Sequence, residues 1–594
     1  MIDFVSEYKD LSADKTIQIA RTILNRLNIN MIEDSVIYNH SLYSMRLFCP
    51  ELNWHTNGKG LTVELCRASA YGEAMERIQN LQFSRTMKEK LFEQGSNVGS
   101  FSYFPDEKEV SYDQIVNRHP EVKQDMINSY IESDKTIPFD FELKNVWTSF
   151  NETDMFKCIP FYSVRDDNIE FLPYNVLQRL TRSNGTAAGN TPEEALCQGL
   201  SEILERYSQE MIYRYNYSPP LIPLQFLKDN CSHLYDIIES ITQNSHVSIY
   251  VMDASLGKGF PVLCLLCVDK TTHRYRVKFG SHPVFRIALE RCLTELAQGN
   301  DFKPETLEQL MVEWNDENQT NYDTLYNWGI NHRKNQGAVP NSFFLLQKSW
   351  QFRPWEEFLR YDNKTGLNFL LEKCKQISKN IYIRDNSFLG FYSYWIYVPG
   401  VSTTYKFHPL GKKTMLSKRL ERIVRNPRQC ITTLSVDEKK ELISIFNRDS
   451  AYYNFEFWEF TKHVILAALY VDVGRFGDAI KQLKNELNPT KYVLGTIREL
   501  ELRQEGVDEQ NRNELIKIFF DDDVLYYIVK NWRNADVLTH VFYPFNLKKH
   551  RDFLEQTKTQ RELFVQIENL LKAEMQLNTV DQYNIRNIVK NITD

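Results

Sequence analysis

The stretch RSNGTAAGNTPEEALCQGLSEILERYSQE, residues 182–210, decides the fold. A loop rich in glycine, alanine and asparagine leads into a segment with the apolar periodicity of a helix. Among the charged residues of this predicted helix are Glu194, Glu202, Glu205 and Arg206. Because the flanking positions are apolar, we expect the glutamates to face inward, where a carboxylate without a cation is costly or becomes protonated.

Two other predicted helices repeat this pattern, in SAYGEAMER (69–77) and LERCLTE (289–295). Their charged residues share a face, because Glu73 and Glu76 are i,i+3 neighbours and Arg291 and Glu295 are i,i+4 neighbours. In any single helix, a solvated charged face is the favoured interpretation. Three such helices together favour a site instead, since like charges on one face are unfavourable unless a cation lies between them.

Small residues precede or accompany these sites (Gly58 and Gly60, Ala68 to Gly72, Gly185 to Gly189, and Gly199), and they allow close approach of backbone or ligand. Clustered glutamates suit Mg²⁺, a hard cation that prefers oxygen ligands and is commonly shared with phosphates. The interleaved arginines suit the phosphates themselves. The sequence has no Walker loop and no kinase signature set, so the pattern predicts a polyphosphate–magnesium site of non-standard architecture.

Three segments resemble the signature segments of the YcaO family: TNGKGLTVELCRASAYGEAMER (56–77), SNGTAAGNTPEEALCQGLSEILERY (183–207) and FGSHPVFRIALERCLTELAQG (279–299). The resemblance covers about residues 1–410. It implies an enzyme that binds ATP and magnesium and phosphorylates the oxygen of a peptide backbone amide while a nucleophile attacks the carbonyl. Such phosphoryl transfer depends on positioning and charge neutralisation.

The resemblance also implies the site residues. Two magnesium ions would be held by ligands drawn from Glu73, Glu76, Glu202, Glu205 and Glu295. ATP would contact Lys9, Thr16, Asn190, Glu194, Arg206 and Arg291, with Thr16 standing where the family has a serine. The catalytic set would be Glu202, Glu205, Arg206 and Arg291. His282 could act as a base, but packing at a helix start is the favoured interpretation. Lys59 receives no role.

Three functions remain open at this stage. The resemblance implies an accessory role in β-methylthiolation of the small-subunit ribosomal protein twelve, beside a radical methylthiotransferase. A second reading is modification of a ribosomally made peptide natural product to an azoline, amidine or thioamide. Azoline formation is disfavoured because the chain ends NIRNIVKNITD, without the proline-rich tail of azoline-forming members. The third reading is a non-catalytic nucleotide-binding scaffold, since tetratricopeptide-like helices bind partners.

The domain expectation is α+β: a mixed α/β catalytic domain over 1–415 and an all-α, tetratricopeptide-like domain over 416–594. Segments 247–255, 260–268 and 274–281 are predicted strands, whereas FTKHVILAALYVDVGRFGDAIKQLKNEL (460–487) is typical of one helix-turn-helix repeat. The CxxC of Cys264 and Cys267 is interpreted as two buried strand cysteines rather than a metal or redox pair.

The composition of the chain restricts the kinds of partner and the cellular compartment that we expect. The net charge of −7 disfavours binding to nucleic acid or to anionic membrane surfaces. No apolar stretch is long enough to span a membrane, and the start lacks the features of a signal peptide. Ten scattered cysteines fit a reducing cytoplasm. The resemblance implies a homodimer.

Overall fold

The computed structural model describes residues 8–34, 36–39, 41–93, 104–129, 155–297, 312–313, 339–354, 362–403, 434–448, 462–485, 491–533 and 547–593. The chain divides into two compact units. The first comprises Met1–Arg85, Ser102–Gly411 and Gln566–Asp594, and the second comprises Thr86–Phe101 and Lys412–Val565. The predicted boundary between residues 415 and 416 lies outside the described residues and stays a prediction.

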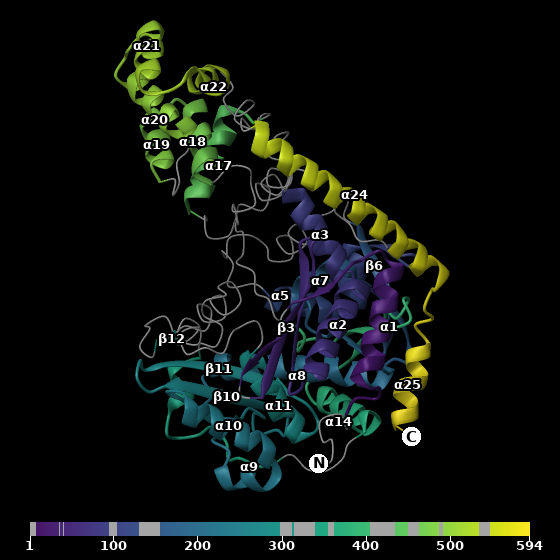
Figure 1. Cartoon of the computed structure of the whole chain (residues 1–594). Coiled ribbons are helices and arrows are strands. Elements are labelled where there is room, and N and C mark those ends of the chain that lie inside the picture. Colours follow the sequence, from purple (N-terminus) through teal and green to yellow (C-terminus); the bar gives the residue numbers. More distant parts are fainter. Residues whose placement is uncertain are drawn as a thin grey trace. The chain divides into compact units, whose positions relative to one another are not determined.

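Three antiparallel sheets form among the described residues of the first unit (Figure 1). One has the order β1 (Ile32–Glu33), β3 (Leu42–Cys49), β2 (Ile37–Asn39), with β4 (Trp54–Gly60) also paired to β3. The second has the order β12 (Val312–Glu313), β11 (Arg274–Ser281), β10 (Val262–Asp269), β9 (Val247–Asp253). The third has the order β5 (Lys108–Ser111), β6 (Met155–Ser163), β13 (Tyr382–Asp385), β14 (Tyr392–Tyr397), β8 (Thr186–Gly189), with β7 (Asn168–Pro173) paired to β6.

The three strands predicted between residues 247 and 281 form the meander β9–β10–β11, in which Leu263 lies opposite both Asp253 and Gly280. Its central strand β10 is buried almost throughout, as its continuous apolar run indicates. Cys264 and Cys267 lie on this strand, fully buried and unpaired, and burial raises the pKa of both thiols. Both cysteines therefore lie where the buried-strand interpretation of the CxxC places them.

Three helices follow glycine-bearing strands: α2 (Val63–Gln79) after β4, α8 (Pro192–Arg214) after β8, and α11 (Phe285–Ala297) near the end of β11. Each helix backbone lies so close to its strand that a Cβ atom on the strand glycine has no room. At Gly58 it would overlap the Cys66 carbonyl oxygen, at Gly189 it would lie 2.6 Å from Ala195 N, and at Gly280 it would lie 2.6 Å from Cys292 N. At these positions the small residues permit close backbone packing.

The last described helix, α25 (Asn584–Thr593), packs in the first unit beside α14 (Asn363–Lys375) (Figure 1). Ile585 and Val589 are buried in the same core cluster that holds the apolar face of α8. Gln582, just before α25, accepts a hydrogen bond from Asp385 N at 2.8 Å and donates to Asp385 O at 3.0 Å. A helix that follows the predicted boundary in sequence thus completes the core of the first unit.

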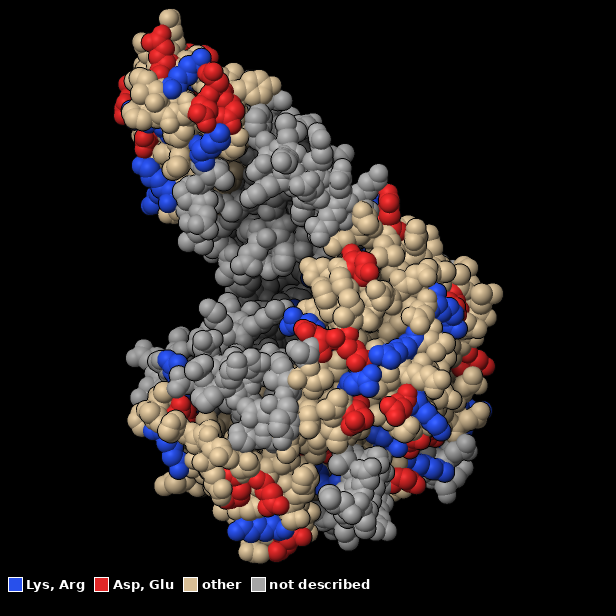
Figure 2. Space-filling model, viewed as in Figure 1, with Lys and Arg blue, Asp and Glu red and all other residues tan. Residues whose placement is uncertain are grey.

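The first unit contains further described helices: α1 (Ala13–Arg26), α4 (Tyr112–Arg118), α5 (Pro120–Asn128), α7 (Tyr174–Thr181), α9 (Leu224–Asn230), α10 (Ser232–Asn244) and the 3₁₀ turn η3 (Asn341–Phe344). Two more helices, α3 (Gln82–Glu93) and α24 (Leu547–Leu577), have residues in both units. Among the described residues, no helix combines the length and the apolar character that crossing a membrane requires. On the face shown in Figure 2, acidic and basic side chains intermingle rather than gathering by sign.

The described part of the second unit is helical: α17 (Val436–Arg448), α18 (Lys462–Asp472), α19 (Phe476–Leu483), α20 (Lys491–Gln504), α21 (Glu509–Phe519) and α22 (Asp522–Trp532). Gly474, with φ of +76°, forms the turn between α18 and α19 where the sequence predicts a helix-turn-helix. Glu499 is fully buried and pairs with Arg503, Arg512 and Arg533. The α+β fold class is confirmed, and the tetratricopeptide-like character stays a prediction.

Candidate functional site

The first turn of α8 builds a polar cluster around Glu194. Thr191 caps the helix, because its hydroxyl accepts from Glu194 N at 3.2 Å. Lys9 Nζ donates to one carboxylate oxygen of Glu194 at 3.0 Å, and the backbone N–H of Asp10 donates to the other at 3.0 Å. Asn190 Nδ2 donates to both oxygens, at 3.1 and 3.0 Å. The predicted nucleotide residues Lys9, Asn190 and Glu194 therefore meet.

Thr16 joins the same cluster, since its hydroxyl donates to Asn190 Oδ1 at 2.7 Å. Glu194 is 5% exposed, and burial alone would raise its pKa. The positive charge of Lys9 and the donors of Asp10 and Asn190 outweigh burial and hold the pKa below its usual value. An ionised Glu194 thus fixes the positions of Lys9 and Asn190.

A second cluster forms where α2 approaches β4 and β8. Arg77 lies between two glutamates and donates to Glu76 Oε1 at 2.7 Å and to Glu73 Oε1 at 3.1 Å. Thr186 Oγ1 donates to Glu76 Oε1 at 2.9 Å, and the backbone N–H of Asn57 donates to Glu73 Oε2 at 2.8 Å. The pair of like charges on α2 is therefore bridged by a cation, as the sequence pattern requires.

Lys59, on β4, pairs with Glu295 of α11. The side chains of both residues are partly buried, at 24% and 29% exposure. Burial lowers the pKa of Lys59 to about 8, against the opposing negative charges of Glu205 and Glu73. Because charges from α2 and α8 both act on a lysine that contacts α11, the three glutamate-bearing helices surround one place.

At this place the pKa values of Glu76 and Glu202 are both raised. Burial raises the pKa of Glu76 to about 7, and the nearby Glu202 and Glu73 raise it further against the effect of Arg77. Burial also raises the pKa of Glu202, while Arg206 lowers it and Glu205 raises it. Crowded carboxylates of this kind suit a divalent cation.

The carboxylates are nevertheless not gathered into a ready-made metal site. Within the described part of the chain, no three His, Cys, Asp or Glu side chains lie close enough together to hold a metal ion as they stand. Oxygens of Glu73, Glu76 and Glu295 are held by Arg77 and Lys59 instead. The donor set fits magnesium chemically, and binding requires these internal cations to give way.

The two predicted arginines lie at different depths. Arg291 Nη1 donates to Ser281 O at 2.8 Å, and its charge acts both on Tyr8 in the first cluster and on Lys59 in the second. Arg206 is exposed, and its charge acts on Glu202. Arg291 therefore links the two clusters, while Arg206 lies at the solvent side of α8.

Some residues of the site have no predicted role. Arg77 and Lys59 lie inside the first signature segment, but their sequence positions do not reveal which carboxylates they pair with. Tyr8 donates to the buried Glu290 at 3.3 Å, and burial raises the pKa of Glu290 to about 7. The only sequence signal for Glu290 is its place beside Arg291 in a charged segment.

His282 is 5% exposed at the start of the α11 segment, and its Nδ1 accepts from Val284 N at 3.0 Å. Its ring packs edge-on against Tyr8 with 5.7 Å between ring centroids. Burial, with the charges of Arg291 and Lys9, holds the pKa of His282 well below its usual value. These contacts agree with the interpretation of His282 as a helix-start packing residue.

Comparison with known proteins defines the class of this domain. Residues 57–402 match the family described as YcaO cyclodehydratase, ATP- and Mg²⁺-binding, which is more than half of the chain. The chain belongs to the YcaO family. Two curated proteins are similar to this chain in sequence. The ribosomal protein S12 methylthiotransferase accessory factor YcaO of Escherichia coli is 30% identical over 358 residues, which cover 59% of this chain and 58% of that protein.

An uncharacterized protein of Haemophilus influenzae is 27% identical over 359 residues, which cover 60% of this chain and 58% of that protein. The chain thus spans less than two thirds of the length of both curated relatives. Among solved structures, a heterocyclase in complex with substrate and cofactor has 17% identity, a TM-score of 0.45 and coverage of 67% of this chain and 53% of its own. YcaO from Methanopyrus kandleri bound with AMPPCP and Mg²⁺ has 16% identity, a TM-score of 0.40 and coverage of 67% and 94%.

Proposed function

We propose that this protein uses ATP and magnesium to activate a backbone amide of a peptide or protein by phosphorylating the amide oxygen. The observation that carries the proposal is the meeting of α2, α8 and α11, whose glutamates act together on Lys59, beside the Lys9–Asn190–Glu194 cluster. Membership of an ATP- and Mg²⁺-binding family supports the same assignment.

The proposed assignment of residues is the one that the resemblance to the YcaO family implies, and the contacts of the two clusters support it. The magnesium ligands are drawn from Glu73, Glu76, Glu202, Glu205 and Glu295, for two ions. The nucleotide contacts are Lys9, Thr16, Asn190, Glu194, Arg206 and Arg291. Glu194 and Glu202 lie about 12 Å apart along α8, at ~1.5 Å per residue, so α8 reaches from the Lys9–Asn190–Glu194 cluster to the proposed magnesium ligands.

When bound, ATP would supply the phosphoryl group and magnesium would neutralise its charge. The side chains of the protein would position the nucleotide and the substrate. An ionised Glu194 holds the Lys9 ammonium and the Asn190 amide in fixed places, while Arg291 brings positive charge between the two clusters. Arg206 is exposed on α8, so its guanidinium is accessible to a phosphate. The catalytic set is accordingly Glu202, Glu205, Arg206 and Arg291.

For the substrate, we favour a role as accessory factor in β-methylthiolation of the small-subunit ribosomal protein twelve, beside a radical methylthiotransferase and as a homodimer. The support is the 30% identity to the Escherichia coli protein of that name. Since the matched part covers 58% of that relative, modification of a ribosomally made peptide natural product is the alternative outcome of the test.

The test is magnesium-dependent ATP binding by calorimetry, with mass spectrometry of peptides from the ribosomal protein after incubation with ATP. We expect tight ATP binding in the wild type and at least roughly tenfold weaker binding in Glu202→Gln, equivalent to about 1.4 kcal/mol. Turnover should be abolished in that variant, because a magnesium carboxylate stabilises the transferred charge.

Glu210→Gln is the matched control, because Glu210 lies two turns further along α8 and pairs with Arg214. Absence of magnesium-dependent ATP binding in the wild type would sink the enzyme proposal. Tight binding without modification of any peptide would instead leave the protein as a nucleotide-binding scaffold.

A further inference from the structure

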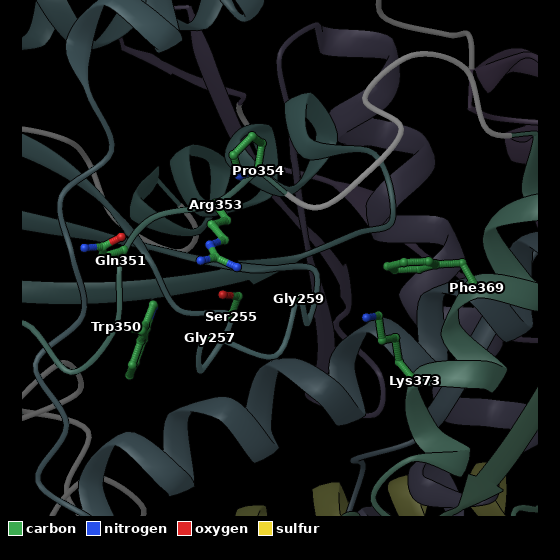
Figure 3. A pocket seen from close by; sticks show the side chains of 9 residues that line it. All are labelled: Ser255, Gly257, Gly259, Trp350, Gln351, Arg353, Pro354, Phe369 and Lys373. Carbon is green, nitrogen blue, oxygen red and sulfur yellow. The ribbon is translucent and has the colours of Figure 1, made fainter.

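A cavity of about 570 Å³ opens in the first unit (Figure 3), and no carboxylate of the candidate site lines it. Its volume lies within the range of sites that hold small ligands or peptide side chains. It is lined by Ser255, Gly257, Gly259, Trp350, Gln351, Arg353, Pro354, Phe369 and Lys373. These residues come from the β9–β10 turn, from the segment 350–354 and from α14.

Two aromatic side chains form apolar walls. Trp350 is held in place because its Nε1 donates to Asp253 Oδ2 at 3.1 Å. Its Cβ lies against the β9–β10 turn so closely that a Cβ on Gly257 would be 3.0 Å away. Phe369 forms the wall on the α14 side (Figure 3). A fixed indole and a phenyl ring suit an apolar side chain of a ligand.

The charged lining residues are both cations. Arg353 is exposed, and Lys373 is partly buried, with its Nζ donating to Lys258 O at 3.2 Å. In Figure 3 both side chains point toward the turn that carries Ser255 and Gly259. Among the described residues that line the cavity there is no Asp or Glu. The ligand that this lining favours is therefore anionic as well as apolar.

Helix α14 connects this cavity to the nucleotide cluster. Asn363, at the start of α14, donates to Tyr8 O at 3.0 Å and accepts from the Cys197 thiol of α8 at 3.1 Å. Lys373 follows ten residues later, about 15 Å along the helix at ~1.5 Å per residue. An extended peptide covers that distance with roughly five residues at ~3.3 Å each.

We propose that the cavity binds an acidic segment of the polypeptide substrate, with an apolar side chain between Trp350 and Phe369 and carboxylates paired with Arg353 and Lys373. This proposal rests on the proposed function, which makes the substrate a polypeptide. A free carboxylate or phosphate would leave most of the volume and both aromatic walls without contacts, and the net charge of −7 disfavours a nucleic acid.

The test uses the full chain with ATP and magnesium and three rhodamine-labelled peptides: Gly-Ser-Glu-Phe-Glu-Ser-Gly and its versions with Gln or Lys in place of Glu. Fluorescence anisotropy should rank them acidic, neutral, basic in order of affinity. The double substitution Arg353→Glu with Lys373→Glu should weaken binding of the acidic peptide at least tenfold and remove the preference. Trp350→Leu should weaken the binding of all three peptides.

Lys375→Glu is the matched control, because Lys375 is exposed on the same helix and pairs with Glu372. It should change binding of the acidic peptide less than twofold. Equal affinity for acidic and basic peptides, or an equal loss in Lys375→Glu, overturns the proposal. Full competition by millimolar inorganic phosphate or free glutamate also overturns it, since a small anion would then suffice.

Calorimetric titration with ATP and magnesium separates this proposal from the proposed function. The Arg353→Glu, Lys373→Glu variant should bind ATP as the wild type does, because neither residue belongs to the nucleotide cluster. If the wild type prefers the acidic peptide but does not bind ATP, the cavity assignment stands and the proposed function fails. If it binds ATP without any peptide preference, the cavity assignment fails and the proposed function stands.

Discussion

At the scale of single residues, Arg77 and Lys59 hold carboxylates that the sequence pattern assigns to magnesium. The two cations reduce the repulsion among five glutamates on three helices. A buried or half-buried carboxylate without such a partner would be costly. At the proposed magnesium site, the same ion pairs would compete with a divalent cation, and we expect them to weaken magnesium binding before a nucleotide adds its own negative charge.

We therefore expect Lys59→Met to bind magnesium more tightly than the wild type in the absence of nucleotide. Loss of the Lys59 charge frees Glu295 and should tighten binding roughly tenfold, or about 1.4 kcal/mol. Calorimetric titration of the nucleotide-free protein with magnesium chloride measures this. Lys15→Met, an exposed position on α1, is the control for removal of one charge. Unchanged or weaker magnesium affinity in a folded Lys59→Met protein would refute the idea.

For single residues, the sequence predicts which residues come together in the nucleotide cluster better than it predicts which side chains pair with one another. Lys9, Thr16, Asn190 and Glu194 do meet, although Lys9 and Glu194 are 185 positions apart. The i,i+3 glutamate pair recurs on α2 and α8, and the family resemblance adds Glu295 of α11, so the glutamates could be proposed as ligands from the sequence. It could not identify which cation pairs with which carboxylate, since Lys59 and Glu295 are brought together only by tertiary packing.

At the scale of elements, the strand glycines fix how the helices α2, α8 and α11 lie on their sheets. Periodicity predicts these helices and the strands β9, β10 and β11 well, because each is long and strongly patterned. The periodicity does not predict which strand each helix contacts. The glycines in the motifs are the sequence signal of that contact, because only a residue without a Cβ atom allows the helix backbone to lie so close to the strand.

Gly58→Ala should therefore lower the melting temperature and weaken ATP binding. The added Cβ would overlap Cys66 O and lie 2.9 Å from Ala70 Cβ, so α2 must shift, at a cost of about 1–3 kcal/mol typical of overpacking. Differential scanning fluorimetry with and without ATP and magnesium tests both effects.

Gly72→Ala is the paired variant. Gly72 lies within α2, and nothing lies within 4 Å of a Cβ placed there. Alanine should stabilise the helix by up to about 1 kcal/mol, because it has the higher helix propensity. If Gly58→Ala melts like the wild type, or if both variants lose ATP binding equally, the close packing of α2 on β4 does not position the site.

At the scale of the whole molecule, the helix α25 belongs to the core of the first unit although some 170 residues separate it from the preceding segment of that unit. The sequence predicts a helix-rich C-terminal region correctly. It gives no signal that Ile585 and Val589 complete the core around α8, because those contacts are with residues hundreds of positions away. Asp167, paired with Arg586 and Lys590, adds an exposed electrostatic contact to this docking.

That contact predicts a pH dependence. Lys590, Tyr162 and Arg586 lower the pKa of Asp167 from its usual value to about 2. A depressed pKa stabilises the folded state at pH values above the unfolded pKa of about 3.9, and this stabilisation is lost as the pH falls toward 2. Asp167→Asn should increase hydrogen exchange in α25 at neutral pH, and the difference from the wild type should disappear between about pH 4 and 2.

Hydrogen exchange measured by mass spectrometry across that pH range tests the contact. Asp236→Asn, at an exposed position on α10, controls for the loss of one negative charge. Equal protection of α25 in Asp167→Asn and wild type at neutral pH would show that Ile585 and Val589 hold the helix without help from this ion pair.

The place of α25 in the first unit also bears on how the protein is made. Segments of the first unit up to Gly411 leave the ribosome early, but their core lacks Ile585 and Val589 until α25 has been synthesised. At ~5–20 residues per second, the roughly 170 intervening residues take about 10 to 35 s. The second unit receives its last segment, which ends at Val565, before α25 is synthesised, so it can begin to fold first, while the nascent first unit exposes the apolar surface that α25 later covers. The dependence of the nascent chain on chaperones should therefore be greatest in this interval.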